Sequence, residues 1–216
     1  MDAGPNILIM TPVTAEKDAV CRGLQNNPRF HVAEAGVGPA EAAVRTTLAL
    51  ARGSYDLVIC MGIAGGFPGR AAVGSLVIAD AIIAADLGAE TPDGFSSLDT
   101  LGFGSSAIEA GAQASALAAA LAQAGLAAAL APILTLSTVT GTAATAQVLS
   151  ERFPRAAAEA MEGFGVATAA QSFGIPVLEI RAISNAIGPR DRSAWRIGEA
   201  LQALEAAGST LLEVLV

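Results

Sequence analysis

Three polar residues lie where a helix or strand is expected to begin or end, and their side chains could do chemistry. Glu16 falls in the first turn of an expected helix, where a favourable interaction with the helix dipole is its ordinary explanation. Glu162 lies among apolar residues, so it either caps a helix or binds sugar hydroxyl groups. Asn185 follows the most clearly predicted strand of the chain, where asparagine most often makes a turn. None of the three decides the function alone.

Other chemical motifs are weaker. The single histidine, His31, has no serine or cysteine in a triad-like setting, so we interpret it as a solvated or capping residue. The turn at Gly36-Val37-Gly38 fails the dinucleotide fingerprint, because Glu41 occupies the third glycine position. Gly65-Gly66 would let a backbone approach a ligand closely, although a tight turn also explains it. No metal site and no organic cofactor is predicted.

The bulk composition limits the class of protein. The 216 residues suffice for one α/β domain, so residues 1–216 are predicted to form a single domain. A net charge of −8 argues against a nucleic-acid partner, since binding to phosphates needs a basic surface. Cys21 and Cys60 form no metal or redox motif and are interpreted as buried thiols. With no signal peptide at the amino terminus, a cytoplasmic location is expected. The weakly polar stretch 114–136 is interpreted as a surface helix leading into a strand, not as a membrane span.

The elements that would hold these residues alternate along the chain. Apolar runs predict strands over 6–10, 30–35, 57–61, 75–85, 131–139 and 176–183. Helices are predicted over 14–24, 40–51, 108–124, 143–152, 162–173 and 193–215. A glycine-rich turn follows at 62–66, and a polar loop is expected over 87–106. This alternation indicates an α/β fold with a mainly parallel sheet covered on both faces, whose ligands bind at the carboxyl ends of the strands.

Four motifs together resemble the superfamily of purine nucleoside phosphorylases and nucleosidases, in order and spacing, over essentially the whole chain. They are Gly36-Val37-Gly38, Gly62-Ile63-Ala64-Gly65-Gly66, Ala160-Met161-Glu162-Gly163 and Arg181-Ala182-Ile183-Ser184-Asn185. The segment from Ser184 through Trp195 looks like the futalosine hydrolase family in particular. The resemblance implies a three-layer α/β/α sandwich with a mixed, mainly parallel sheet. It also implies a homodimer or a higher homo-oligomer.

The resemblance assigns roles to residues near the sugar. Glu16 would position or activate the attacking water, and Glu162 would hold the ribose hydroxyl groups, with Met161 packed on the ribose. Ala64 and Gly65 would line the ribose and water site.

The base and the far end of the substrate have their own residues in this resemblance. Backbone groups near Ala143 and Ala144 would meet the purine. Ser184, which belongs to the motif of residues 181–185, would also bind the substrate. Asn185 stands where adenine-specific nucleosidases carry an acidic aspartate. Its NH₂ can donate hydrogen bonds to O6 and N7 of a 6-oxopurine, which favours hypoxanthine as the leaving group. The source of any leaving-group proton stays open between Asp191 and solvent.

Futalosine carries a benzoate beyond its sugar. Arg190 or Arg192 could pair with that carboxylate, although a solvated loop of alternating charge before the last helix is the slightly better explanation of either arginine alone.

These features predict hydrolysis of the N-glycosidic bond of futalosine, a purine nucleoside, to hypoxanthine and dehypoxanthinyl futalosine in menaquinone biosynthesis. One alternative is a nucleosidase for methylthioadenosine or adenosylhomocysteine. Another is a purine nucleoside phosphorylase, for which Arg45 would be a candidate phosphate ligand although a helix-surface arginine is the common case. A further alternative is a non-catalytic nucleoside-binding protein, since a fold alone does not prove activity.

Overall fold

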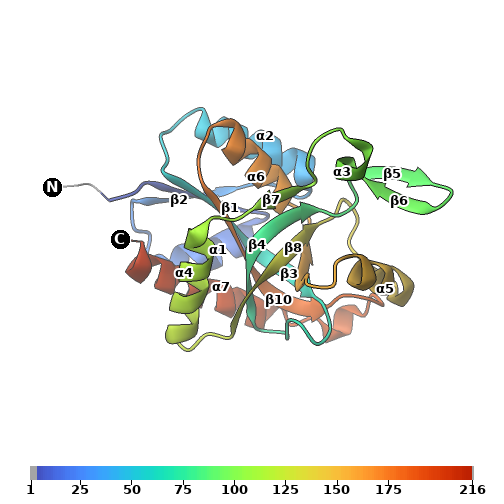
Figure 1. Ribbon diagram of the computed structural model, residues 1–216. Coiled ribbons are helices and arrows are strands. Elements are labelled where there is room, and N and C mark those ends of the chain that lie inside the picture. The colour runs from blue at the N-terminus through green and yellow to red at the C-terminus, as the bar shows by residue number, and fades with distance from the viewer. Residues whose placement is uncertain (1–3, 216) are drawn as a thin grey trace.

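The computed structural model describes residues 4–215 of the chain as a sheet with helices packed around it (Figure 1). The strands of the main sheet are β1 (Ile7–Thr11), β2 (Phe30–Glu34), β3 (Leu57–Gly66), β4 (Leu76–Ala84), β7 (Ala107–Glu109), β8 (Ala128–Thr135), β9 (Ala158–Ala160) and β10 (Val177–Ala186). The helices are α1 (Thr14–Gly23), α2 (Pro39–Leu50), α3 (Leu98–Leu101), α4 (Ala112–Gln123), α5 (Ala143–Arg152), α6 (Gly163–Ser172) and α7 (Ile197–Val214). A short 3-10 helix covers Arg192–Ala194, and a hairpin of β5 (Gly88–Thr91) and β6 (Gly94–Ser97) projects from the body of the protein.

The sheet is mixed and mainly parallel, which confirms the prediction. Parallel pairs join β1 to β2 and β3, β3 to β10, β4 to β8, and β8 to β9, whereas β4–β10, β3–β9 and β4–β7 are antiparallel. Because β10 pairs with both β3 and β4, and β9 joins β3 to β8, these five strands close into a ring. The sequence did not predict this closure.

Helices bury both faces of the strands, which explains why the strands are apolar without alternation. Ile7 and Ile9 of β1 face a hydrophobic cluster that includes residues of α1, α4 and α7. Their neighbours Leu8 and Met10 face a second cluster with residues of α2 and α6. In Figure 1 α1, α4 and α7 lie below the sheet, and α2 and α6 lie above it.

The glycine-rich segment after Met61 differs from the prediction. It was expected to be a turn, but β3 continues as a strand to Gly66. The reason is tertiary, since β10 pairs with this segment on one side and the short strand β9 pairs with Gly65 and Gly66 on the other. The sequence analysis missed β9 because three residues give too short a pattern.

Two other predictions need correction. The supposed loop over 87–106 contains the β5–β6 hairpin and α3. The helix expected over 108–124 begins only at Ala112, because Ala107–Glu109 pairs with β4 and Gly111 then starts the helix.

Cys60 is buried as predicted, but Cys21 is half-exposed, so the prediction of a buried thiol is wrong there. His31 is exposed, and its ring stacks on Tyr55 with ring centroids 5.9 Å apart. Within residues 4–215, no helix is both long and apolar enough to cross a membrane.

Candidate active site

A cavity of about 530 Å³ opens at the carboxyl ends of β1, β3 and β10, as expected for a sheet of this kind. Most of the predicted site residues line it: Glu16, Ala64, Gly65, Met161, Glu162, Ser184, Asn185, Arg190 and Arg192. Ala143 and Ala144 do not, because they form the exposed first turn of α5. Val139 and Thr140, just before that turn, line the cavity in their place.

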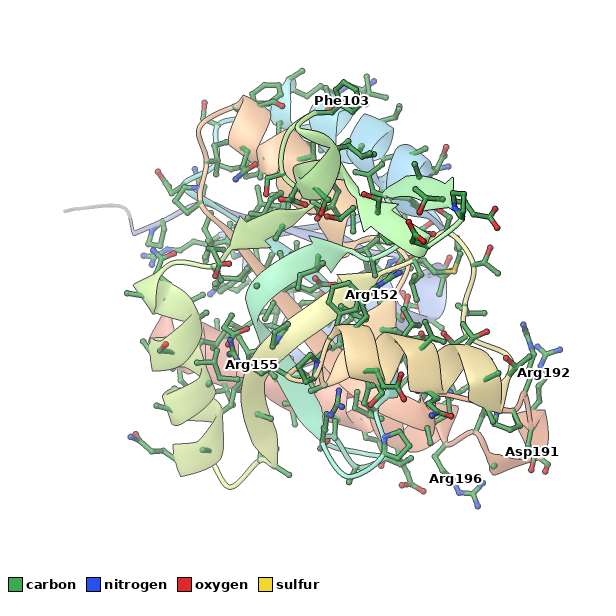
Figure 2. The ribbon with its side chains drawn as sticks, turned by 45° about the vertical axis from the view of Figure 1, so that its right-hand side comes forward. Phe103, Arg152, Arg155, Asp191, Arg192 and Arg196 are labelled. Carbon is green, nitrogen blue, oxygen red and sulfur yellow. The ribbon has the colours of Figure 1, made fainter. Side chains whose placement is uncertain are left out.

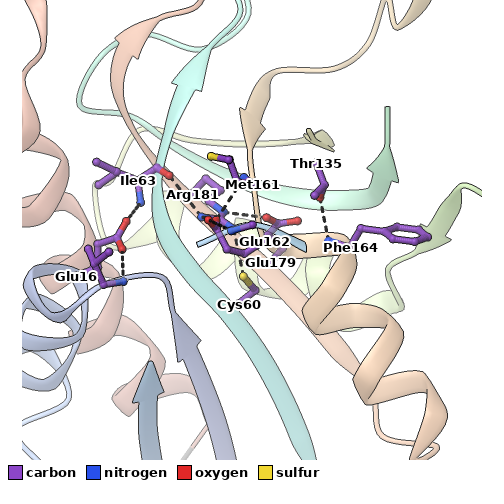
Figure 3. Close-up of polar contacts among 11 residues, drawn as sticks. Glu16, Cys60, Ile63, Thr135, Met161, Glu162, Phe164, Glu179 and Arg181 are labelled. Carbon is purple, nitrogen blue, oxygen red and sulfur yellow. Dashed lines mark hydrogen bonds and ion pairs between the residues drawn. The ribbon is translucent and has the colours of Figure 1, made fainter. Parts of the chain in front are cut away.

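Glu16 is buried at the start of α1, and backbone groups hold its carboxylate. The N–H of Val13 donates to Oε2 at 3.0 Å, which closes the exposed end of the helix. The N–H of Ile63 in β3 donates to Oε1 at 2.8 Å, so the carboxylate also ties α1 to the sheet (Figure 3). Burial raises the pKa of Glu16, although these two hydrogen bonds and the charge of Arg181 oppose the rise.

Arg181 of β10 is fully buried and organises the acidic residues behind the cavity. Its Nη1 lies 3.1 Å from Oε2 of Glu162, and its Nε donates to Oε1 of Glu179 at 2.8 Å (Figure 3). Its Nη2 contacts Sγ of Cys60 at 3.2 Å. Buried charges are stable only when they are paired, so the arginine and the carboxylates depend on one another.

Glu162 stands immediately before α6 and is 4% exposed. Besides Arg181, it accepts hydrogen bonds from the backbone N–H groups of Gly38 and Met161, both at 3.3 Å. The left-handed conformation of Gly38, with φ of 92°, belongs to the turn that presents this N–H. Glu162 occupies the N-cap position of α6, but its side chain makes no capping hydrogen bond, so the interpretation as a helix cap is wrong. Its carboxylate lies in the wall of the cavity, where the role of binding sugar hydroxyl groups stays a prediction.

Glu179 is fully buried and packs against Gly163. A Cβ on Gly163 would lie 2.1 Å from Oε2 of Glu179, so no larger residue fits there without displacing the carboxylate. That Oε2 has no hydrogen-bond partner in the described part of the chain. Burial raises the pKa of Glu179, against the opposing charge and hydrogen bond of Arg181.

Asn185 faces the cavity from a bulge in β10. The pairing of β10 with β3 shifts register between Ile183 and Asn185, and such a bulge re-aims side chains. The hydroxyl of Ser184 lies 2.8 Å from Oδ1 of Asn185, and Nδ2 donates to the carbonyl of Ala186 at 3.0 Å. An amide NH₂ has two donors, so one N–H remains for a ligand.

Glu159 is a buried cavity residue that the sequence analysis missed. Thr140 donates from its N–H to Oε1 at 2.8 Å and from its hydroxyl to Oε2 at 2.5 Å. Burial raises the pKa of Glu159, while these hydrogen bonds lower it. The only sequence signal was a charged residue between the alanines at 158 and 160, which became informative once β9 was known.

The outer rim of the cavity carries two arginines and an indole. The guanidinium carbons of Arg190 and Arg192 lie 5.7 and 5.8 Å from the ring centroid of Trp195, within cation–π range. Figure 2 shows Arg192 and Asp191 projecting from the body of the protein at this end. Asp191 does not line the cavity, and hydrogen bonds from the hydroxyl and N–H of Ser193 lower its pKa. It is therefore ionised at neutral pH and poorly suited to donate a proton.

Arg45, the candidate phosphate ligand, lies on the surface of α2. Its Nε is 2.6 Å from Oε1 of Glu41, one helical turn away, and neither residue lines the cavity. The arginines among the cavity-lining residues are Arg190 and Arg192.

Comparison with known proteins agrees with this geometry. Residues 7–216 match the model of the phosphorylase superfamily. The chain is 50% identical to the futalosine hydrolase of Streptomyces coelicolor, an alignment that covers 97% of this chain and 96% of the relative. The fold is similar to that of the futalosine hydrolase of Helicobacter pylori, with a TM-score of 0.83, 18% identity, and 96% and 97% of the two chains covered. It is also similar to a methylthioadenosine/adenosylhomocysteine nucleosidase from Colwellia psychrerythraea, with a TM-score of 0.81, 20% identity, and 98% and 96% covered. The chain belongs to the phosphorylase superfamily, in the branch that contains the futalosine hydrolases.

Proposed function

We propose that this chain is an N-glycosyl hydrolase that cleaves futalosine to hypoxanthine and dehypoxanthinyl futalosine, a step of menaquinone biosynthesis. The observation that carries the proposal is one cavity lined by the buried carboxylates of Glu16 and Glu162 and by the amide of Asn185. The high identity to a futalosine hydrolase over nearly the whole chain supports the same substrate.

Cleavage of an N-glycosidic bond gives the sugar oxocarbenium character, so it needs negative charge beside the ribose. Glu162 supplies this charge at a fixed place, because Arg181 and two backbone N–H groups hold its carboxylate. In the proposed reaction Glu162 binds the ribose hydroxyl groups, and Met161, which lines the same wall, packs on the sugar.

Glu16 is the proposed base for the attacking water. Each of its oxygens accepts one backbone hydrogen bond, which leaves further lone pairs free to accept a proton from water. Burial moves its pKa upward, toward the neutral range in which a general base works best. Ala64 and Gly65 line the space beside it.

Asn185 is the proposed partner of the departing purine. The hydroxyl of Ser184 lies 2.8 Å from its carbonyl oxygen, so this oxygen has a partner within the protein and the second N–H of the amide is left to donate to a ligand. A donor suits O6 and N7 of hypoxanthine and cannot serve as an acid for an adenine leaving group.

The rim residues suit the benzoate of futalosine. The indole of Trp195 offers a flat surface to an aromatic ring, and Arg190 or Arg192 offers a bidentate partner to the carboxylate.

Four broader features belong to the proposal. Residues 1–216 form one domain with the layers of an α/β/α sandwich, supported by the two hydrophobic clusters on opposite faces of the strands. The segment before α5 borders the purine through Val139 and Thr140, which line the cavity where Ala143 and Ala144 do not. The protein works in the cytoplasm, consistent with its free cysteines, and as a homodimer or higher homo-oligomer.

The test is incubation of the purified protein with futalosine, inosine or methylthioadenosine, with and without phosphate, followed by chromatography and mass detection. We expect hypoxanthine and dehypoxanthinyl futalosine at the same rate with or without phosphate. A sugar 1-phosphate would identify a phosphorylase, and adenine from methylthioadenosine would identify the alternative nucleosidase. Binding of futalosine without any product would identify a nucleoside-binding protein.

A further inference from the structure

Glu159 and Asn185 flank the same glycine. Gly65 of β3 pairs with Glu159 of β9 on one side and with Asn185 of β10 on the other. Residues paired across neighbouring strands point to the same face of a sheet, so both side chains rise on the cavity side of Gly65. A Cβ on Gly65 would lie 3.4 Å from Cγ of Glu159 and 3.6 Å from Nδ2 of Asn185.

Gly65 therefore leaves an open space between a hydrogen-bond donor, the amide of Asn185, and an acceptor, the carboxylate of Glu159. Neighbouring strands lie about 5 Å apart, so the backbones of Glu159 and Asn185 are roughly 10 Å apart across the glycine. A side chain at position 65 would intrude on this space and approach Cγ2 of Ile187 to 2.8 Å. A flat heterocycle can lie over a glycine in this position with one edge toward each polar group.

The carboxylate of Glu159 keeps free acceptor sites. Thr140 uses one lone pair on each oxygen, and an ionised carboxylate has about four acceptor sites in all. Burial raises the pKa of Glu159, and the two donors from Thr140 oppose that rise in favour of the ionised form, which accepts hydrogen bonds and donates none. Unlike Glu162 and Glu179, it has no arginine within ion-pair distance among the described residues.

We propose that Glu159 accepts the ring N–H at position 1 of a 6-oxopurine, and so makes the cavity select this base over a 6-aminopurine. The inference rests on the proposed function and deepens it. A 6-oxopurine carries a hydrogen on N1 and an oxygen at C6, whereas a 6-aminopurine has an unprotonated N1. Beside a carboxylate, the N1–H of the 6-oxopurine donates a hydrogen bond, whereas N1 of the 6-aminopurine places a second acceptor against the carboxylate oxygen. Asn185 then binds O6 or N7 with its remaining N–H.

The experiment compares wild type with Glu159→Gln on futalosine and on its 6-amino analogue. In the variant, the amide oxygen of the glutamine can keep the hydrogen bond from the N–H of Thr140. The NH₂ group then takes the place of the second carboxylate oxygen, so a donor stands where wild type has an acceptor. We expect the ratio of kcat/KM for the two substrates to fall by about 10- to 100-fold, with the 6-oxo substrate losing and the 6-amino substrate retained or improved. Titration calorimetry should show the same change in the ratio of affinities for free hypoxanthine and adenine.

Controls separate a specific effect from a general one. Glu151→Gln on the exposed face of α5 changes the same functional group outside the cavity and should leave the ratio unchanged. Thr140→Val removes only the hydroxyl bond to Glu159 and should give a smaller shift in the same direction, which keeps a test available if Glu159→Gln does not fold.

An unchanged ratio in a folded variant would overturn the inference, and so would an equal loss on both substrates, which would indicate an acid or a structural residue. If wild type cleaves no futalosine, the proposed function fails, while the affinities for the two free bases still test Glu159.

Discussion

Replacing Arg181 with methionine should destabilise the protein strongly, because it leaves two buried carboxylates without their shared partner. Glu179 is 0% exposed and Glu162 is 4% exposed, and each loses an ion pair of 2.8 or 3.1 Å. Removing one partner of a buried pair costs about 3–5 kcal/mol. Oε2 of Glu179 already has no hydrogen-bond partner in the described residues, so it has little means of compensation. For a chain of this length the midpoint of thermal unfolding should fall by roughly 6–20 °C.

The loss should depend on pH in a defined direction. Burial already raises the pKa of Glu179 above its ordinary value of 4.5 with Arg181 present, so the folded protein binds this proton more tightly than the unfolded chain does. Stability therefore falls as pH rises from about 4.5 through the raised value. Without Arg181 the pKa rises further, so the deficit of the variant should be largest at neutral pH and smallest near pH 5.

The assay is urea unfolding followed by circular dichroism at about pH 5 and pH 7.5. Arg22→Met is the matched control, since the Arg22–Glu205 pair is exposed and should contribute no more than about 1 kcal/mol. Adding Glu179→Gln to the Arg181→Met variant should recover part of the loss, because it removes one unpaired charge. A folded Arg181→Met variant within about 1 kcal/mol of wild type at pH 7.5, or a loss that is equal at both pH values, would refute the reasoning.

Three further predictions concern turnover. Glu16→Gln should reduce kcat by about 10²- to 10⁴-fold while the protein stays folded, and Glu162→Gln should also lose most turnover. Steady-state assays measure both rates, and circular dichroism checks that both variants are folded. A near-normal rate in either variant would remove that residue from the mechanism. In wild type kcat/KM should fall on the acid side of its pH profile with a midpoint above pH 4.5, because burial raises the pKa of Glu16 and the charged base is lost as pH falls. A midpoint at or below pH 4.5 would contradict the role of Glu16 as base. The double variant Arg190→Ala, Arg192→Ala should raise KM for futalosine about 10-fold or more and leave KM for inosine unchanged. Equal KM values for futalosine in the variant and wild type would exclude the contact with the carboxylate.

Much of the fold could be predicted from local patterns. Ile7–Thr11 reads as a strand because helices cover both faces, which makes its first four residues apolar, and Val177–Ala186 reads as a strand although Glu179 and Arg181 interrupt its apolar run. The helix Ala143–Arg152 was predicted with its observed ends. Glu16 could be placed because it lies at the start of the helix after such a strand, and Asn185 because it lies near the end of one.

What the sequence could not supply depends on distant pairings. The strand character of residues 62–66 comes from β10 and β9, and glycine has no local preference that reveals it. Glu159 sits in a three-residue strand within an alanine-rich segment, so nothing local showed that it faces a cavity. Arg181 did leave a signal, since a charged residue among the apolar residues of a buried strand must be paired. Its partners, however, include a residue of β3 and the residue before α6, and only the folded chain brings these together.

The closed ring of strands also affects how the protein is made. During synthesis β3 leaves the ribosome with one of its edges bare, because β10 follows it by roughly 110 residues, or on the order of 5–20 s of translation. For that time a long apolar strand offers its unpaired N–H and C=O groups to any other nascent chain. The strand that later lines the cavity is thus prone to aggregation in the nascent chain. The yield of folded protein in the cell should depend on translation speed and on chaperones that cover exposed strand edges.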